Sequence, residues 1–439
     1  MEFRKALINA RHHIVFILGL ATALFISFAI ETRETSQVLG NITFEHEEKI
    51  PLKPSRILTQ EEYQWANTAW KYFENNYQEN TGLVNSVDGY PSTTMWDTAS
   101  YLMGLISAEK LNVITEDVFN IRMEKALHTL ARLPLVNNRL PNKAYNTITL
   151  EMVDYSNSPT PNGIGWSAID IGRILVPFNI LIWQYPEFNK SVNNVLNAWH
   201  VGDMIKEGYL YGARLSATSD GFELVQEGRI GYEEYASKSM SLMGRDVFNA
   251  MKYIDYLEFK TISGVEIPTD LRDPAKYHAH NYVVSESYIL DGLEFGADSV
   301  SKIFAHRVYQ AQENRYRDTG IVTAVSEDNL DQAPYFVYNT VFSDGKEWNA
   351  ITDTGEDASE FKSLSTKAAF GWYALYKTDY TNILINEVNT LYSEKKGWFS
   401  GRYESDGTKN KAITANTNGI VLESLAYIEN GPLLSVGAK

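Results

Sequence analysis

The strongest constraint on the fold is a helical pattern that recurs over most of the chain. Apolar residues return every three or four positions in twelve segments, separated by clusters of Gly, Pro, Asn and Asp. The first segment opens with a capping box, because Thr59 is followed three residues later by Glu62. The segments predicted as helices are Thr59–Tyr77, Thr94–Glu109, Thr115–Leu133, Trp166–Trp183, Asn189–Ile205, Tyr232–Tyr256, Glu286–Gly296, Ser299–Arg317, Ala333–Phe342, Ser363–Tyr376, Tyr380–Ser393 and Asn416–Glu429.

Twelve consecutive helices predict an all-α domain, an (α/α)6 toroid of six helix pairs over residues 59–439. In a closed toroid the last pair contacts the first, so the two ends of the domain should be adjacent. A solenoid of helical repeats is the alternative, but the sequence shows no self-similarity at a fixed period. Short strands are expected around Leu210–Leu215 and Phe222–Val225, as a hairpin within a loop.

The N-terminus predicts a membrane anchor. Residues 14–30 form an apolar run of 17 residues without a charge, at the short end of the range that spans a bilayer. Three basic residues precede this run, which predicts a cytoplasmic N-terminus at residues 1–13. We therefore expect one transmembrane signal-anchor in the inner membrane, a flexible linker over residues 31–58, and the domain in the periplasm or outside the cell. A cleaved signal peptide is the competing interpretation, because small residues flank Phe28 at cleavage spacing.

Composition and charge narrow the classes of partner. A net charge of −16 argues against a nucleic-acid partner, which would require a basic face. The absence of Cys excludes a disulfide framework, a thiolate nucleophile and a cysteine metal site. The chain has 27 Tyr and 9 Trp, rings that could stack on sugars in a groove or pack between helices.

Motif searches indicate neither a metal nor a cofactor. The sequence contains no HExxH, no phosphate-binding glycine loop and no GxSxG nucleophile elbow. His278 and His280 lie in a loop without carboxylates at ligand spacing, so exposed loop histidines are the favoured interpretation.

With those motifs absent, carboxylates beside aromatic residues are the remaining candidates for a catalytic site. Glycoside hydrolysis needs two carboxyl groups, one protonated to donate to the leaving oxygen and one ionised to act on water or on the sugar. Four polar loops could carry them, over residues 140–165, 208–234, 325–357 and 397–417. The candidates in or beside these loops are Asp97, Asp154, Asp170, Glu227, Glu233, Glu234, Asp328 and Asp331.

Structural alternatives apply to several of these candidates. Asp97 lies at the start of a predicted helix, where a carboxylate is favoured by the helix dipole alone. Asp170 could form a structural ion pair with Arg173 on the same helix face. Glu233 and Glu234 point about 100° apart on a helix, so only one of them can face a cleft and both could complement the dipole.

Three stretches carry a family resemblance: LPNKAYNTITLEMVDYSNSPTPNGIGWSAIDIGRIL, VQEGRIGYEEYASKSMSLMG and TANTNGIVLESLAY. They resemble a bacterial family catalogued as domain of unknown function 3131, from about Thr59 to the C-terminus. More distantly the chain is similar to bacterial glucoamylase-like and endo-β-1,2-glucanase families. That resemblance implies an (α/α)6 fold and cleavage of a glucan by acid–base chemistry.

The distant resemblance also implies site residues. The Ser-x-x-Asp of those families resembles Ser167 to Asp170, and their Gly-aromatic-Asn-Glu-Tyr turn resembles residues 231–235, with the glutamate at Glu234. Their late Gly-x-Asp-x-Gly-Pro-Ile-Val-Leu segment resembles residues 417–422 around Asn418. The Asp and Pro of that last pattern are missing here, and Glu233 replaces the Asn.

The residues and the resemblance together predict a membrane-anchored glycoside hydrolase that acts on a periplasmic or exported glucan. Glu234 is the expected general acid, with Asp170 or Asp154 placing water or the sugar. The expected substrate-binding residues are Trp96, Asp97, Trp166, Glu227, Tyr232 and Asn418. A non-catalytic glycan-binding or polysaccharide-assembly protein on the same fold is the main alternative, and a helical scaffold for protein partners is a third.

Overall fold

The computed structural model describes residues 15–23, 49–216, 221–227, 229–272, 277 and 281–435. The chain divides into two compact units, one made of residues 1–47 with 252–255 and one made of the rest. Residues 15–23 are helical, but no helix among the described residues is long and apolar enough to cross a membrane. The rest of the predicted anchor lies outside the described residues, as do residues 1–13 and residues 31–48 of the predicted linker. The anchor therefore stays a prediction.

The larger unit is rich in helices. Within residues 49–435 its described α-helices are α3 (Gln60–Asn75), α4 (Met95–Lys110), α5 (Glu116–Leu130), α6 (Ala168–Gln184), α7 (Asn189–Ala198), α8 (Tyr232–Leu242), α10 (Glu286–Leu290), α11 (Ser299–Thr319), α12 (Thr366–Leu375), α13 (Asp379–Val388) and α14 (Ala415–Asn430). The π-helix η4 (Asp291–Phe295) continues α10, and the described 3-10 turns are η1 (Pro186–Phe188), η2 (Val201–Met204), η3 (Ile254–Tyr256) and η5 (Ser359–Phe361).

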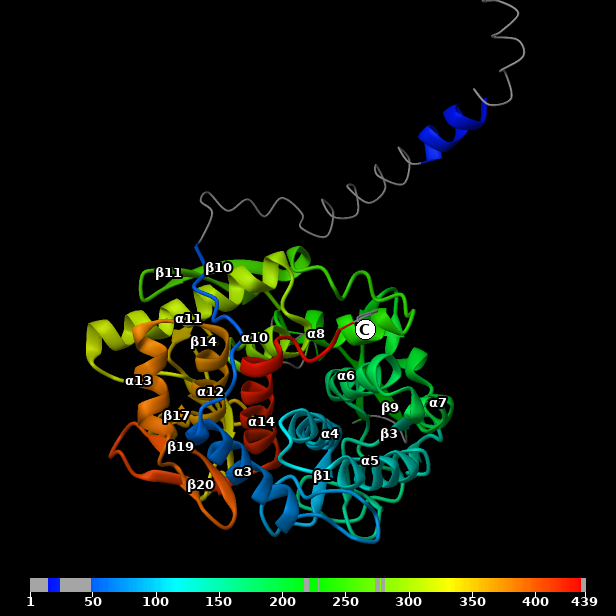
Figure 1. Ribbon diagram of the computed structural model, residues 1–439, viewed down its shortest axis with the longest axis horizontal. Helices are drawn as coiled ribbons and strands as arrows, with labels where there is room; N and C mark the ends of the chain where they lie inside the picture. The colour runs from blue at the N-terminus through cyan, green and yellow to red at the C-terminus, as the bar shows by residue number, and fades with distance from the viewer. Residues whose placement is uncertain are drawn as a thin grey trace, which may run out of the picture. The chain divides into compact units, whose positions relative to one another are not determined.

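Six of these helices form a closed ring. Along the ring α4 packs on α6, α6 on α8, α8 on α10, α10 on α12, α12 on α14, and α14 again on α4. Helices α3, α5, α7, α11 and α13 lie outside them, as Figure 1 shows. This alternation of outer and inner helices is consistent with an (α/α)6 fold. The ends of the domain meet as predicted, because α3 packs on α14. The predicted flexible linker is wrong at its C-terminal end, because the backbone N–H of Arg56 donates to the carbonyl of Ile428 at 2.8 Å and that of Lys53 to Leu375 at 2.9 Å.

The sixth outer position departs from the prediction. Between α8 and α10 the described residues contain the 3-10 turn η3, a single helical residue at Tyr277 and the hairpin of β10 and β11, which packs against α11. The helix predicted over Tyr232–Tyr256 already ends at Leu242. The helix predicted over Ala333–Phe342 is wrong, because Phe336–Asn339 forms a strand in which buried and partly exposed residues alternate. Aromatic and β-branched residues in period-two alternation favour that outcome.

The expectation of an all-α domain holds for the helical ring only, because short strands fill the connections. The described strands are β1 (Ser92–Thr94), β2 (Leu135–Val136), β3 (Leu140–Pro141), β4 (Ala144–Asn146), β5 (Met152–Val153), β6 (Ile205–Lys206), β7 (Tyr209–Leu210), β8 (Gly212–Leu215), β9 (Phe222–Val225), β10 (Leu257–Ile262), β11 (Val265–Asp270), β12 (Glu327–Asn329), β13 (Phe336–Asn339), β14 (Phe342–Ser343), β15 (Lys346–Glu347), β16 (Ala350–Ile351), β17 (Ser363–Ser365), β18 (Tyr392–Ser393), β19 (Gly397–Tyr403) and β20 (Lys409–Ile413).

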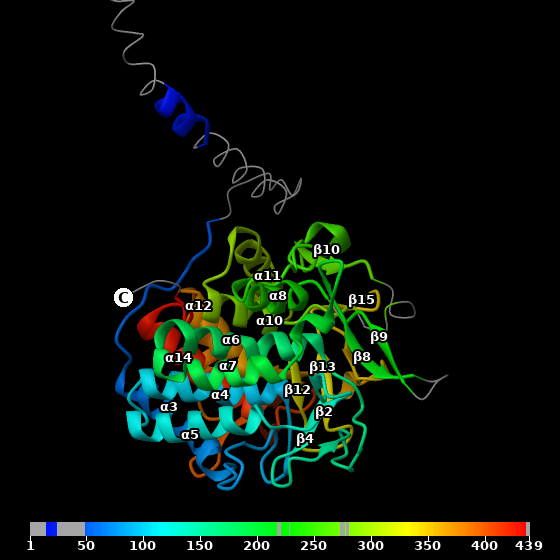
Figure 2. The same ribbon diagram turned by 90° about the vertical axis from the view of Figure 1, so that its right-hand side faces the viewer.

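The strands pair in small antiparallel sheets. The larger ones are β1-β4-β5, β12-β13-β16 and the group in which β19 pairs with β17, β18 and β20. The hairpin predicted in a loop is confirmed as β8–β9, with Gly212 opposite Val225. Figure 2 shows β4, β8, β9, β12 and β13 gathered at one end of the helices.

The inner helices are apolar on all sides, which is the pattern of a buried helix. In α4, every residue from Thr98 to Ala108 is buried. Close approaches occur at glycine, since a Cβ on Gly172 of α6 would lie 2.4 Å from the Cβ of Ala236 in α8. The helices begin at polar caps, and Thr94, Ser167, Ser365 and Thr414 each accept a backbone N–H at the start of an inner helix.

A buried cation links the inner helices at the centre of the ring. The side chain of Arg173 in α6 is completely buried, and its guanidinium is paired with Glu294 at 3.4 Å and Glu423 at 3.3 Å. It also donates to the hydroxyls of Tyr235 at 3.2 Å and Ser100 at 3.3 Å. These partners, which we call the Arg173 cluster, come from α4, α8, η4 and α14. Contacts within the cluster therefore join five positions of the six-helix ring.

Candidate active site

The first residues of the inner helices meet at one end of the ring. Trp96 of α4, Glu286 of α10, Lys367 of α12 and Asn416 of α14 are in direct contact there, and Tyr232 of α8 packs beside Trp96. We call this end the N-terminal face of the ring. Because the positive ends of the helix dipoles point toward it, the face favours negatively charged side chains.

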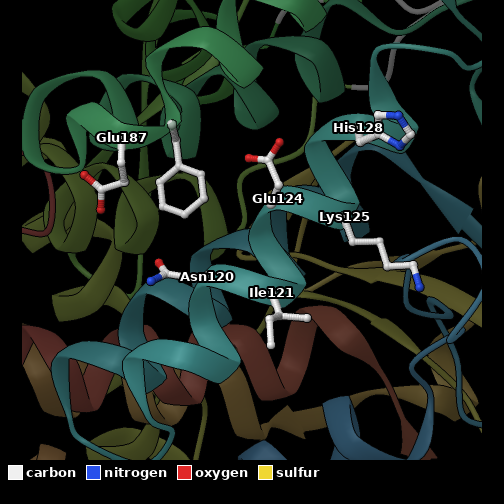
Figure 3. A pocket seen from close by; sticks show the side chains of 7 residues that line it. Asn120, Ile121, Glu124, Lys125, His128 and Glu187 are labelled. Atoms are coloured by element: carbon white, nitrogen blue, oxygen red, sulfur yellow. The ribbon is translucent and has the colours of Figure 1, made fainter.

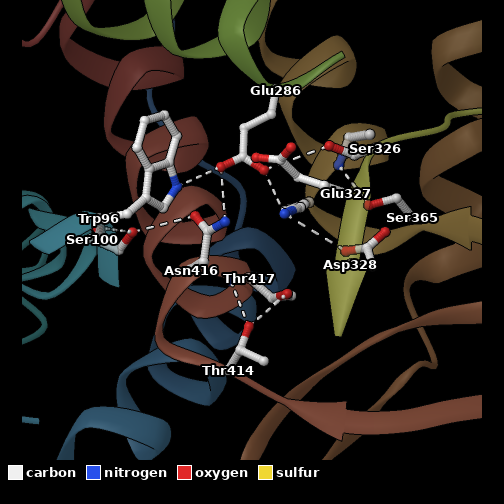
Figure 4. Close-up of polar contacts among 12 residues, drawn as sticks. Trp96, Ser100, Glu286, Ser326, Glu327, Asp328, Ser365, Thr414, Asn416 and Thr417 are labelled. Carbon is white, nitrogen blue, oxygen red and sulfur yellow. Dashed lines mark hydrogen bonds and ion pairs between the residues drawn. The ribbon is translucent and has the colours of Figure 1, made fainter. Parts of the chain in front are cut away.

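Glu286 lies at the centre of this face and is held by four donors (Figure 4). Its Oε1 accepts from the indole N–H of Trp96 at 2.9 Å and from the amide of Asn416 at 2.8 Å. Its Oε2 pairs with the ammonium of Lys367 and accepts from Ser326 at 3.5 Å. Burial opposes its charge, but the cations of Lys367 and Arg173 outweigh that effect and lower the pKa of Glu286. The carboxyl is therefore an ionised, fixed group.

Glu327 follows Ser326 on β12 and is partly exposed at the same face. The hydroxyl of Tyr232 donates to its Oε1 at 2.8 Å, while its Oε2 has no hydrogen-bond partner among the described residues. Burial, followed by the charge of Glu286, raises the pKa of Glu327 to about 7. Its buried neighbour Asp328 lies 3.8 Å from the ammonium of Lys367, and burial also raises the pKa of Asp328 to about 7.

Asp170 is a second partly exposed carboxyl, and it lies in the first turn of α6. Its Oδ1 accepts from the hydroxyl of Ser167, which also caps the helix. Burial, followed by repulsion from Glu227, raises the pKa of Asp170 to about 7. The ion pair with Arg173 considered from the sequence does not form, because Arg173 pairs with Glu294 and Glu423 instead.

Asp170 and Glu327 both lie near the side chain of Tyr338. The charges of both carboxyls contribute to the raised pKa of Tyr338 on β13. In the ring, α6 and α12 are three positions apart, and Glu327 belongs to the segment that leads into α12. The two carboxyls therefore come from different parts of the ring and lie near the same tyrosine.

Aromatic rings complete the face. The centroids of Trp96 and Tyr232 are 5.6 Å apart, and Tyr282 stacks on Tyr338 at 4.1 Å. The guanidinium of Arg229 lies over the ring of Tyr282 at 3.9 Å. Its side chain is partly exposed, and its Nε has no described partner. Flat rings and unused polar atoms side by side are what a bound sugar contacts.

The structure brings most of the predicted binding residues to this face. Asp97 is bound by the hydroxyls of Ser86 at 2.7 Å and Thr94 at 2.8 Å. Glu227 accepts from the backbone N–H of Ala168 at 2.7 Å, directly beside Asp170. Trp96 and Tyr232 lie in the contacts described above.

Three other predicted residues have local partners. The indole of Trp166 donates to the carbonyl of Tyr211 at 3.1 Å, and its ring faces Phe222. Asp154 accepts the backbone N–H groups of Ser156 and Ser158 in its own loop. Asn418 is completely buried, and its amide connects α14 to the backbone of β19.

Glu234, the expected general acid, is placed in a helix cap. Its side chain is 3 % exposed, and its Oε2 accepts the backbone N–H of Gly231 at 2.7 Å, closing the first turn of α8. Burial, followed by the charge of Glu233, raises the pKa of Glu234 well above its ordinary value. Glu233 pairs with the guanidinium of Arg272. Neither carboxyl has the partial exposure of Asp170 or Glu327, so the geometry favours a structural role for both.

The residues that sequence reasoning missed are Glu286, Glu327 and Lys367. A signal existed for Lys367, because a lysine in the apolar segment that starts α12 needs an anion, just as Asp170 needed a partner. Asp328 was singled out while Glu327 was not. Adjacent strand residues point to opposite faces, and here Asp328 is buried and Glu327 is partly exposed.

Other site types find little support in the described part of the chain. No cluster there has three His, Cys, Asp or Glu side chains arranged to hold a metal, and His278 and His280 lie outside the described residues. A pocket on the outer surface, shown in Figure 3, is lined by Asn120, Ile121, Glu124, Lys125, His128, Glu187 and Phe188. It lies on α5 and η1 and contains none of the predicted site residues.

Comparison with solved structures identifies relatives of the fold. A glucoamylase-like protein from Bacteroides fragilis superposes with a TM-score of 0.61 at 12% identity, over 89% of this chain and 94% of that one. An endo-β-1,2-glucanase from Chitinophaga pinensis, in complex with sophorotriose and glucose, gives 0.61 at 10% identity, over 86% and 94%. An endo-β-1,2-glucanase from Talaromyces funiculosus, in complex with sophorose, gives 0.54 at 11%, over 85% and 84%.

Comparison by sequence gives the family. No curated protein matches the chain. A family model matches residues 64–431, which is most of the chain, and confirms the resemblance noted from the three sequence stretches. The chain therefore belongs to DUF3131, a family described as proteins of unknown function.

Proposed function

We propose that this protein is a glycoside hydrolase that acts on a glucan at the N-terminal face of its helical ring. The observation that carries the proposal is the pair Asp170 and Glu327, two partly exposed residues that lie near Tyr338 and whose carboxyl pKa values are both raised to about 7. Groups of this kind can exchange protons at neutral pH, which general acid and base catalysis requires. The similarity of the fold to glucanases supports a glucan as the substrate class.

Glu327 is the proposed general acid. Its Oε2 is buried and has no hydrogen-bond partner among the described residues, and the anion of Glu286 favours the protonated form. Its proton passes to the glycosidic oxygen as the bond to the anomeric carbon breaks. Asp170, ionised, acts on the opposite side of the sugar, on water or on the anomeric carbon. In this proposal Asp170 keeps the role expected from the sequence. The general acid is Glu327 in place of Glu234.

Trp96, which is partly exposed, is the proposed stacking ring, and Tyr232, which is 2 % exposed, packs against it. Tyr232 donates to Glu327, and Asp97, next to Trp96, lies near enough to Asp170 for its charge to raise the pKa of that carboxyl. The indole N–H of Trp96 is already used by Glu286, and the guanidinium of Arg173 lies over its ring at 4.7 Å, so a sugar would contact the part of the ring that remains exposed.

Incubation with a panel of glucans tests the proposed function. We expect new reducing ends from at least one glucan, with β-1,2-glucan first in the panel and α- and other β-linked glucans beside it. Oligosaccharide that binds but stays intact after long incubation would favour the non-catalytic glycan-binding alternative. Neither binding nor release from any glucan would contradict the proposal.

We further propose that residues 14–30 anchor the protein in the inner membrane, with the domain outside the cytoplasm. The basis is the charge-free apolar run preceded by basic residues. The full chain is expected in the membrane fraction with its N-terminus intact by mass spectrometry. A mature N-terminus near Ile30 would contradict the retained anchor and leave export standing.

A further inference from the structure

Glu286 and Lys367 contact the residues on either side of the proposed acid, since Glu286 accepts from Ser326 and the ammonium of Lys367 lies 3.8 Å from Asp328. Their side chains are buried, and the contacts of Glu286 come from α4, α12, α14 and the segment before β12. The donor in that segment is Ser326, the residue that precedes Glu327. The pair is therefore fixed in space and connected to the backbone that carries Glu327.

We propose that Glu286 and Lys367 are positioning residues, a buried charged pair of opposite signs that together determine whether Glu327 carries its proton. The effect on catalysis rests on the proposed function. The effect on the protonation of the Glu327 carboxyl does not depend on it. Neither residue contacts the sugar in this scheme.

The charged and titratable groups that face Glu327 come from several elements. Glu286 of α10 and Asp328 of β12 are anionic when ionised, and they favour a proton on Glu327. Lys367 of α12 and Arg229, which precedes α8, are cations and favour the ionised form. The hydroxyl of Tyr232 donates to the carboxylate and acts in the same direction as the cations. The change in the protonation of Glu327 therefore depends on whether Glu286 or Lys367 is replaced.

Two single substitutions should therefore shift the pH profile in opposite directions. Glu286→Gln removes the anion and leaves the Lys367 cation, so Glu327 should lose its proton at lower pH. The alkaline limb of kcat/KM should then move down by about one pH unit or more. Lys367→Met removes the cation and leaves the anion, so the same limb should move up. A purely structural role would lower activity in both variants without this reversal of sign.

A lone buried charge can also unfold a protein, so the double variant Glu286→Gln/Lys367→Met is part of the test. It removes both charges together, and its alkaline limb should lie between those of the single variants. Lys238→Met is the matched control. Lys238 of α8 is a lysine with a side chain 14 % exposed that pairs with Asp291 and Asp298. Lys238→Met should leave the alkaline limb of kcat/KM at the same pH as in the unchanged protein.

The titration can also be observed without turnover. Carbon-13 NMR of protein labelled at the glutamate carboxyls, with the Glu327 signal assigned by Glu327→Gln, reports the protonation of this group directly. If no glucan is cleaved but the Glu327 titration shifts down in Glu286→Gln and up in Lys367→Met, the proposed function fails and this inference stands. Shifts in one common direction, or none in either variant, would overturn the inference.

Discussion

Replacing Glu327 by Gln is expected to lower turnover of a cleaved glucan by about 10²–10⁴-fold, the usual contribution of a general acid. The amide keeps the shape of the side chain and can still accept from the hydroxyl of Tyr232, so oligosaccharide binding should remain within a few-fold. The variant removes the proton that passes to the leaving oxygen. Kinetics on the glucan identified by the panel, with binding measured by calorimetry, separate the two effects.

Glu234→Gln is the matched control for this experiment. It makes the same chemical change at a buried carboxyl three residues after Gly231, where the side chain closes a helix cap. We expect a lower thermal midpoint and turnover close to that of the unchanged protein. The opposite ranking, with Glu234→Gln inactive and Glu327→Gln active, would return the general acid to Glu234.

Replacing Arg173 by Met should cost about 3–5 kcal/mol of unfolding free energy, because it leaves two carboxyls buried without their cation. Glu294 and Glu423 are both fully buried, and no other cation pairs with them among the described residues. Burial already raises the pKa of both carboxyls with Arg173 present, and without its charge their folded-state pKa values should rise further above those of the unfolded chain. Both carboxyls are then protonated at low pH in either state, so the loss of stability should grow as the pH rises.

Urea denaturation at pH 5 and pH 8 measures this effect. Arg139→Met is a suitable comparison, since Arg139 pairs with Asp203 at the surface, where an ion pair contributes little. Equal unfolding midpoints for the two variants would show that the Arg173 cluster does not stabilise the ring. A loss in Arg173→Met that is the same at both pH values would show that its two carboxyls remain ionised.

The starts of helices were predicted well where the capping residues lie close together in the sequence. The capping box of Thr59 and Glu62 is present in the structure, and Ser167 caps α6 three residues before Asp170. Both depend on residues within one turn of each other. The predicted helix over Ala333–Phe342 failed because its apolar residues fit two periods, and pairing with β12 and β16 decided between them.

The site was less accessible to sequence reasoning because its parts come from distant segments. Trp96, Glu286, Lys367 and Asn416 meet only after the ring closes, and no spacing in the chain brings them together. Asp170 was found because a carboxylate in an apolar helix is unusual by itself. Glu234 fitted a family pattern by its position in the chain, but its third place in α8 directs the side chain back to the helix start.

Because the ring is closed, the neighbours of each helix do not depend on the helix at which the chain begins. Residues near both ends of the domain are already hydrogen-bonded, at Arg56 and Ile428. A short linker across this junction, with new ends opened at the exposed turn around Asn112 between α4 and α5, would preserve every neighbour in the ring. That turn follows the C-terminal end of α4, opposite the face that carries the carboxyls. The architecture is therefore suited to circular permutation, and the native starting point is one of several that would give the same ring.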